Sequence, residues 1–212
     1  MSAPNGTEKS EESHRQLPDP KTLAEAGELP IKDENGNEVA FKTLYADKPA
    51  HERQLIIFIR HFFCGSCEEY VRALAGQLPP ATLSQTSPPT TLTLIGCGDP
   101  VCIADYKTRT HCPFPIYADP SRNLYAKLDM LVTLRQPPKQ PDYITMSFFS
   151  IVTSSFKNVV MSGLKGLKGG PASQNGGEWL FEGGQLKFVH RMRNTADHSE
   201  IKELEQVLGI QG

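Results

Sequence analysis

The sequence has no surplus of positive charge and no long apolar run. Its 212 residues contain 22 Lys and Arg against 24 Asp and Glu, so the formal net charge is −2 at pH 7. Binding to a nucleic-acid backbone depends on a cationic surface, so this balance argues against nucleic acid as a partner. The longest apolar run is residues 55–59, far below the roughly 20 residues that span a bilayer. We therefore expect a soluble protein without a membrane partner.

The first residues contain no apolar leader, and the cysteines do not suggest a disulfide scaffold. Residues 1–20 are rich in Ser, Glu, Pro and Asn without a hydrophobic period, so we expect a disordered tail and no secretion signal. The chain has five cysteines, an odd number. Cysteines in an unsecreted chain of this length are catalytic, metal-binding or buried. We expect a cytoplasmic protein.

Beyond the tail, alternating strand-like and helix-like segments predict a single α/β domain over residues 28–210. Two short β-prone runs flank an Asn-Gly pair within residues 29–44, which is typical of a hairpin. Residues 55–62, LIIFIRHF, form an apolar run typical of a buried central strand. The next segment has an apolar helix face and stops at two prolines; the face consists of Cys67, Tyr70, Val71, Leu74 and Leu78.

Later segments continue this pattern. Strands are predicted at residues 91–96 and 114–119 and on both sides of residues 182–184, and helices over residues 100–110, 121–130 and 198–210. Residues 135–176 form an insertion with a predicted helix, which either packs on the sheet or serves as a lid or partner groove. One apolar face of that helix would contain Phe149, Val152, Phe156 and Val160.

The sequence Cys64-Gly65-Ser66-Cys67 lies where the buried strand gives way to the helix. Free backbone N–H groups and the positive end of the helix dipole stabilise a thiolate there and lower its pKa, so Cys64 is the predicted nucleophile. Cys67 follows one turn later, near the roughly 5.5 Å Cα separation that a disulfide prefers, and is the predicted resolving thiol. Open α/β sheets bind ligands beyond the C-terminal ends of their strands, which places the site here.

Charged neighbours act on this thiol in both directions. Arg60 and His61 precede the motif on opposite faces of the strand end, and a cation there favours the thiolate, whereas Glu68 and Glu69 oppose it. Arg60 either steers an anionic or peroxide oxygen or forms a surface salt bridge. His61 either transfers a proton to a leaving thiolate or packs at the strand end. The sequence leaves these alternatives open.

The sequence also allows more than one role for each of the three further cysteines. A structural zinc site would recruit Cys97, Cys102 or Cys112 together with His61 or His111, but these spacings match no compact ligand pattern, and we expect no metal. Cys97 follows the second strand, whose end lies beside the end of the first, so it is a candidate supporting residue and the rival disulfide partner. Each of the three also fits a small buried side chain.

The stretch HFFCGSCEEYVRALA resembles the peroxiredoxin-like members of the AhpC/TSA group in the thioredoxin-like superfamily. FPIYADPSRNLYAKLDM and GGEWLFEGGQLKFVHRMRNTADH are similar to a strand-helix segment and the closing hairpin of the same group. The resemblance extends over about residues 28–210. It implies a thioredoxin-like fold, with a central mixed sheet flanked by helices, an N-terminal hairpin and an insertion helix. It also implies that Cys64 and Cys67 reduce peroxides or disulfides, with an external thiol reductant and no organic cofactor.

Two positions depart from the pattern of these families. Typical peroxiredoxins place Pro seven and Thr or Ser three residues before the peroxidatic Cys, where this chain has Ile57 and His61. We therefore predict slow reduction of hydrogen peroxide. Thioredoxins place a cis-Pro before the hairpin that faces the dithiol, whereas the nearest proline before Trp179 is Pro171. The alternative to an enzyme is a non-catalytic thioredoxin-like accessory module that binds a partner or assists a biosynthetic pathway.

Overall fold

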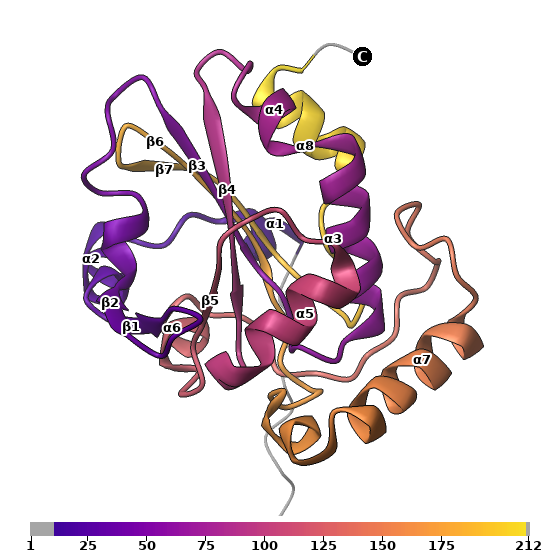
Figure 1. Ribbon diagram of the computed structural model, residues 1–212. Coiled ribbons are helices and arrows are strands. Elements are labelled where there is room, and N and C mark those ends of the chain that lie inside the picture. Colours follow the sequence, from indigo (N-terminus) through magenta and orange to yellow (C-terminus); the bar gives the residue numbers. More distant parts are fainter. Residues whose placement is uncertain (1–10, 211–212) are drawn as a thin grey trace, which may run out of the picture.

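The computed structural model describes residues 11–210, apart from the side chains of residues 11, 12, 148, 149, 151, 152, 154–156 and 164. Figure 1 shows a twisted sheet between layers of helices. The strands are β1 Pro30–Lys32, β2 Glu38–Ala40, β3 Arg53–Phe58, β4 Thr90–Gly96, β5 Ile116–Ala118, β6 Gly177–Glu182 and β7 Gln185–Arg191. The α-helices are α1 Glu11–Arg15, α2 Pro20–Gly27, α3 Gly65–Gln77, α4 Pro80–Leu83, α5 Ile103–Thr110, α6 Asn123–Lys127, α7 Phe148–Met161 and α8 Ile201–Leu208.

The strands form one mixed sheet in the order β2-β1-β5-β4-β3-β6-β7. β3 is parallel to β4, and β4 to β5, whereas β6 pairs antiparallel with β3 and with β7. β3 therefore lies in the middle of the five strands from β5 to β7, as its apolar sequence predicts. A continuous apolar run suits this place because both faces of the strand are covered.

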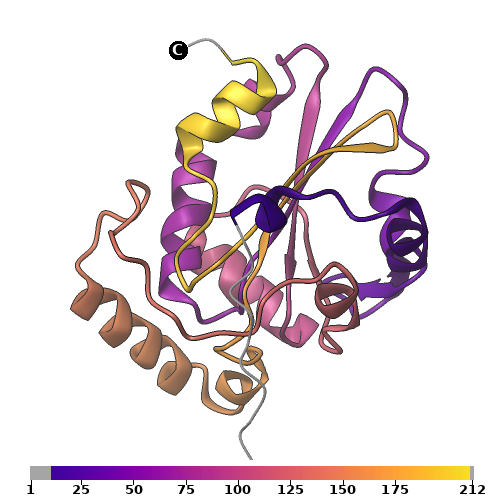
Figure 2. The same cartoon turned by 180° about the vertical axis from the view of Figure 1, so that it is seen from behind.

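Helices cover both faces of the sheet, and each face has its own apolar core (Figures 1 and 2). Leu55 and Ile57 of β3 belong to the core that includes α3, α5 and α8, whereas Ile56 and Phe58 belong to the core that includes residues of α2 and α6. The alternation follows from the strand geometry, in which successive side chains point to opposite faces. The chain leaving β3 then runs to α3 on the first of these faces.

The fold class predicted from the sequence is confirmed. β1 and β2 form the N-terminal hairpin, β6 and β7 form the closing hairpin, and the predicted face of α3 is fully buried. One boundary was wrong, because β3 ends at Phe58 whereas the sequence predicted a strand to residue 62. The chain leaves the sheet earlier because a turn forms before the helix, in which the Cys64 N–H donates to the His61 carbonyl at 3.1 Å.

Helix α1 lies within the range for which the sequence predicted a disordered tail. The buried His14 side chain and the ion pair between Arg15 and Glu203 attach this helix to the domain, and Figure 2 shows it against β7. Residues 1–10 of that range lie outside the described residues. The division into a tail, a domain over residues 28–210 and an insertion stays a prediction.

Helix α7 lies inside the predicted insertion of residues 135–176. It packs against α3 and lies outside the layer of α3 and α5, so it covers helices rather than the sheet (Figure 1). Of its predicted apolar face, Val160 is exposed, and the side chains of Phe149, Val152 and Phe156 lie outside the described residues. None of the helices between residues 11 and 210 is long and apolar enough to cross a membrane.

Candidate active site

Cys64 is the N-cap residue of α3, as the sequence predicted for the nucleophile. Its sulfur accepts a hydrogen bond from the backbone N–H of Cys67 at 3.4 Å, and it lies at the positive end of the helix dipole. Both cysteines are free thiols and are buried, with 3% of Cys64 and 0% of Cys67 exposed. The helix start therefore holds a reduced dithiol in which only the first cysteine reaches the surface.

Arg60 is the cation that acts on this dithiol. Its Nη1 donates to the Cys64 sulfur at 3.3 Å and to the carbonyl oxygen of Thr195 at 3.2 Å. Its Nε donates to the carbonyl oxygen of Gln174 at 3.2 Å, and its Nη2 donates to that of Ala172. These four acceptors fix the guanidinium beside the sulfur. Arg60 therefore does not form the surface salt bridge that the sequence analysis considered.

The pKa values of the two thiols are shifted in opposite directions. Burial raises the pKa of a thiol, but at Cys64 the hydrogen bond from the Cys67 thiol and the charge of Arg60 outweigh it and hold the pKa well below its usual range. Burial, the same hydrogen bond and the charge of Cys64 raise the pKa of Cys67 well above its usual range. The site therefore favours the thiolate form of Cys64 and the protonated form of Cys67.

Ser66, between the two cysteines, adds a hydroxyl to the site. Its Oγ lies 3.1 Å from the Cys64 sulfur and 3.0 Å from the carbonyl oxygen of Thr195, and its proton serves one of the two. His61 is partly exposed, and burial lowers its pKa. Its imidazole is therefore neutral at pH 7 and adds little positive charge beside the thiolate.

A pocket of about 590 Å³ opens over Cys64. Arg60, His61 and Ser66 form its polar end together with Cys64. An apolar wall comes from the chain before α7 and consists of Leu134, Pro137, Pro141 and Ile144. The sequence placed Arg60 and His61 on opposite faces of the strand end, but both line this pocket, because β3 ends before them.

The other three cysteines do not line the pocket over Cys64. Cys97 belongs to the core on the opposite face of the sheet, where its thiol donates to the carbonyl oxygen of Arg60 at 2.7 Å. Burial raises the pKa of Cys97 to about 12 and those of Cys102 and Cys112 to about 11. All three are buried, protonated side chains. The described residues contain no group of three or more Cys, His, Asp or Glu placed to hold a metal ion.

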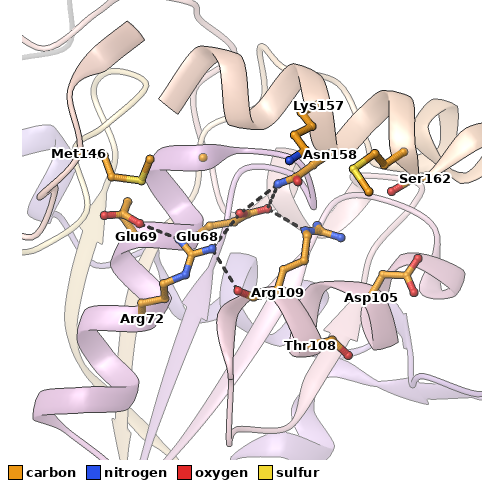
Figure 3. Close-up of a pocket in the computed structure, with 12 residues that line it drawn as sticks. Glu68, Glu69, Arg72, Asp105, Thr108, Arg109, Met146, Lys157, Asn158 and Ser162 are labelled. Atoms are coloured by element: carbon orange, nitrogen blue, oxygen red, sulfur yellow. Dashed lines mark hydrogen bonds and ion pairs between the residues drawn. The ribbon is translucent and has the colours of Figure 1, made fainter. Parts of the chain in front are cut away.

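A second pocket, of about 790 Å³, lies between α3, α5 and α7 (Figure 3). The buried Glu68 carboxylate lies at its centre, where it pairs with Arg72 at 3.2 Å and with Arg109 at 3.1 Å and accepts from Asn158 of α7 at 3.4 Å. Glu69 also pairs with Arg72, at 2.6 Å. These ion pairs compensate the negative charges of the two glutamates, which the sequence analysis expected to disfavour the Cys64 thiolate.

Sequence reasoning missed several parts of the site. The carbonyl oxygens of Ala172, Gln174 and Thr195 come from loops more than 110 positions away from Arg60, and backbone acceptors leave no mark in a sequence. The apolar wall around Ile144 was counted only as part of the insertion. Ser66 was visible inside the motif, and its polar side chain at the start of the helix was a usable signal.

A buried dithiol at the start of the helix that follows a central parallel strand is the arrangement of thiol-based redox proteins with a thioredoxin-like fold. The chain belongs to the AhpC/TSA antioxidant enzyme family, whose family model matches residues 77–194, more than half of the chain. The matched residues begin at the end of α3, so the dithiol precedes them.

Curated relatives agree with this family assignment, and a solved structure shares the fold. Peroxiredoxin-like 2C of Mus musculus is 33% identical over 193 residues, covering 89% of this chain and 80% of that protein, and its Homo sapiens counterpart is 32% identical over the same extent. The bacterioferritin comigratory protein of Xanthomonas campestris superposes with a TM-score of 0.53 at 12% identity, covering 92% of this chain and 93% of that chain. At that identity the likeness shows a common fold.

Proposed function

We propose that this chain is a thiol-based oxidoreductase that reduces peroxides or disulfides with the Cys64–Cys67 dithiol. The Cys64 thiolate attacks a peroxide oxygen, the O–O bond breaks, and the leaving oxygen takes a proton as an alcohol or water. Cys64 is then a sulfenic acid. Cys67 attacks its sulfur, the S–O bond breaks with loss of water, and a disulfide forms. An external thiol returns two electrons and restores the dithiol.

The observation that carries this proposal is the environment of the Cys64 sulfur. A helix N-terminus, the Arg60 guanidinium and the Cys67 thiol all stabilise its anion, and the sulfur lies at the floor of an open pocket. A sulfur atom that was only part of the core would have neither the cation nor the opening. Reaction with a disulfide substrate uses the same steps, with a thiolate as the leaving group.

The pocket supports a substrate with an apolar body. Leu134 and Ile144 line the pocket together with Cys64, while His61 occupies the position where typical peroxiredoxins have Thr or Ser. We therefore propose that organic hydroperoxides react faster than hydrogen peroxide, which reacts slowly. An apolar wall adds binding energy only for a substrate that has apolar area to bury. A cytoplasmic location, where thiols are kept reduced, suits this cycle.

The proposal is tested by mapping reactivity and turnover on the same preparations. Reduced protein is treated with limiting iodoacetamide at pH 6 and pH 8, and the labelled cysteines are identified by mass spectrometry. Cys64 should label first at both values. Turnover with an organic hydroperoxide and dithiothreitol should be lost in Cys64→Ser, and Cys97→Ser, a matched buried cysteine, should keep it.

Two results would contradict this function. Earlier labelling of Cys97 or Cys112 would remove the nucleophile assignment. Labelling of Cys64 without turnover on either hydroperoxides or disulfides would indicate the non-catalytic accessory module instead.

A further inference from the structure

Arg109 of α5 contacts the chain on both sides of Cys64, although the proposed cycle does not use it and it does not line the pocket over Cys64. Its Nη2 donates to the carbonyl oxygen of Phe62 at 2.6 Å, and its Nε donates to Oε1 of the buried Glu68 at 3.1 Å (Figure 3). Phe62 precedes Cys64 by two positions, and Glu68 follows it by four. One guanidinium therefore joins the turn before α3 to the first turns of that helix.

Aromatic side chains fix the place of this guanidinium. Its Cζ lies 5.0 Å from the centre of the Phe63 ring and 5.8 Å from that of the Tyr106 ring, which is the range of cation–π contacts. The Arg109 side chain is only 19% exposed. An arginine that served only to balance the charge of Glu68 would not need contacts with the turn before Cys64.

Phe62 is the fixed point of that turn. Its ring packs on Tyr106 with centroids 5.5 Å apart, and a Cβ added at Gly96 of β4 would lie 2.5 Å from the ring. Its N–H donates to the carbonyl oxygen of Gly169 at 2.9 Å, and its carbonyl oxygen accepts from Arg109. The ring, the N–H and the carbonyl group thus each have a partner outside the turn. A side chain bonded to Phe62 is therefore bonded to a rigid part of the domain.

The geometry of the turn matters because Cys64 is the N-cap residue of α3. The Cys64 N–H donates to the carbonyl oxygen of His61 at 3.1 Å, and its own carbonyl oxygen accepts from the N–H of Glu68 at 2.9 Å. The Cys64 sulfur accepts from the N–H of Cys67 at 3.4 Å. Hydrogen bonds weaken as their angle departs from linear, so the contact with the sulfur depends on how the turn meets the helix. A bond between Phe62 and Glu68 by way of one side chain holds that angle.

Arg60 and Arg109 act on the nucleophile in different ways. The Arg60 guanidinium donates to the Cys64 sulfur directly. The hydrogen bonds of Arg109 go to the Phe62 carbonyl oxygen and to the Glu68 carboxylate. Arg109 therefore acts on the sulfur only through the backbone on either side of it.

We infer that Arg109 is a positioning residue for the Cys64 thiolate, because it joins Phe62 to Glu68 and so holds the turn against α3 in the geometry in which the helix start stabilises the sulfur. The inference rests on the proposed dithiol function, which makes Cys64 the nucleophile. Loss of this connection should leave the pocket and Arg60 in place but weaken the helix cap. The thiolate should then form only at higher pH.

Arg72 offers a matched control on the same carboxylate. It pairs with Glu68 at 3.2 Å and with Glu69 at 2.6 Å, and it donates to the backbone carbonyl oxygen of Arg109 at 3.1 Å. Within the part of the chain that the structure describes, it makes no hydrogen bond to residues 60–64. Arg72→Met therefore removes ion pairs from α3 but keeps the connection between Phe62 and Glu68.

The test follows the alkylation of Cys64 by iodoacetamide from pH 4.5 to pH 9.5, because this reaction reports the thiolate without any turnover. Label on Cys64 is quantified by tandem mass spectrometry. In Arg109→Met the midpoint of the pH–rate profile should move up by roughly 0.5–1 unit, the scale of a lost helix-cap interaction. Alkylation below the wild-type midpoint should therefore slow by about threefold to tenfold. At pH 9.5 it should lie within about twofold of wild type, because the thiol is then ionised in both proteins. Arg72→Met should match wild type throughout.

Arg109→Lys separates the geometry of this side chain from its charge. A lysine keeps the cation beside Glu68 but lacks the planar fork that reaches both acceptors, so alkylation below the midpoint should stay at least about twofold slower than in wild type. Circular dichroism checks that each variant is folded. If Arg109→Met does not fold, the Lys variant decides the question.

A wild-type pH–rate profile in a folded Arg109 variant would overturn the inference, and full recovery in Arg109→Lys would assign the effect to charge instead. Slowing by the same factor at every pH would indicate a general structural role and would also overturn it. So would an equal shift in Arg72→Met. A wild-type Cys64 that alkylates no faster than Cys97 at pH 6 is a different failure: it would reject the proposed dithiol function, and the inference would fall with it.

Discussion

The Arg60 guanidinium lies 3.3 Å from the Cys64 sulfur and also donates to three backbone carbonyl oxygens from two distant loops. One side chain therefore stabilises the thiolate and holds the loops that surround it. The charge of Cys64 in turn raises the pKa of Arg60 against the effect of burial. Thiolate and guanidinium form an ion pair that belongs to the reduced site.

Replacement of Arg60 by Lys should weaken both roles. A lysine keeps a charge but cannot reach four acceptors at once, so the pKa of Cys64 should rise. Alkylation of Cys64 at pH 6 should slow by up to about tenfold for each unit of that rise. The unfolding free energy should fall by roughly 1–3 kcal/mol, because buried carbonyl groups lose their donor. Arg193→Lys, whose partner is Asp197, is the control. Unchanged alkylation at pH 6 would contradict the ion pair.

The lowered pKa of Cys64 predicts a pH dependence of stability in the reduced protein. The group is a thiolate when folded and a thiol when unfolded, so its contribution is fully present above the unfolded pKa near 8.5. That contribution is lost as the pH falls through the folded pKa. The difference in unfolding free energy between wild type and Cys64→Ser should therefore grow with pH up to about 8.5. Urea titrations at several pH values under reductant measure it, and a constant difference would exclude the thiolate.

The apolar wall of the pocket predicts substrate preference. Leu134 lines the pocket and is 61% exposed, so Leu134→Ser should leave the fold intact. It should lower kcat/KM for a bulky organic hydroperoxide severalfold and leave that for hydrogen peroxide unchanged, because only the larger substrate buries area there. Leu167→Ser, at an exposed leucine outside this pocket, is the control. Equal losses with both substrates would contradict a role in binding.

The buried Glu68 carboxylate predicts a stability coupling between α3 and α5. Arg109→Met should destabilise the protein by roughly 2 kcal/mol, less than the 3–5 kcal/mol of a fully broken buried pair, because Arg72 still pairs with Glu68. Glu68→Gln in the same chain should recover part of this loss, because no uncompensated charge is left. Strictly additive losses in a double-mutant cycle would show that the two side chains do not interact.

The parts of the molecule that depend on local patterns could be predicted from the sequence. The apolar run of β3 and the spacing of Cys67, Tyr70 and Leu74 on α3 reflect strand and helix periods, and they place the dithiol at a helix N-terminus. The two glycines after Glu182 have positive φ, which the turn between β6 and β7 requires. Such signals need only neighbouring residues.

The rest depends on contacts between distant segments, which no local pattern encodes. Arg60 binds carbonyl groups 112 to 135 positions away, and the wall of the pocket comes from an insertion without a strong period. Glu178 lies near the start of β6, and the sequence placed His198 in the closing helix, which begins at Ile201. The sequence alone therefore does not distinguish the buried Glu178 carboxylate from an exposed one, because its burial depends on contact with the distant segment around His198.

Non-reducing peptide mapping after a single oxidation tests the dithiol mechanism most directly. Reduced protein is exposed to one equivalent of an organic hydroperoxide or to diamide, quenched with an alkylating agent, digested and analysed by mass spectrometry. The mechanism predicts a dominant Cys64–Cys67 disulfide, because the backbone N–H of Cys67 already donates to the Cys64 sulfur at 3.4 Å, and free Cys97, which lies in the core on the other face of the sheet. A dominant Cys64–Cys97 crosslink, or a Cys64 that stays reduced with both oxidants, would contradict it.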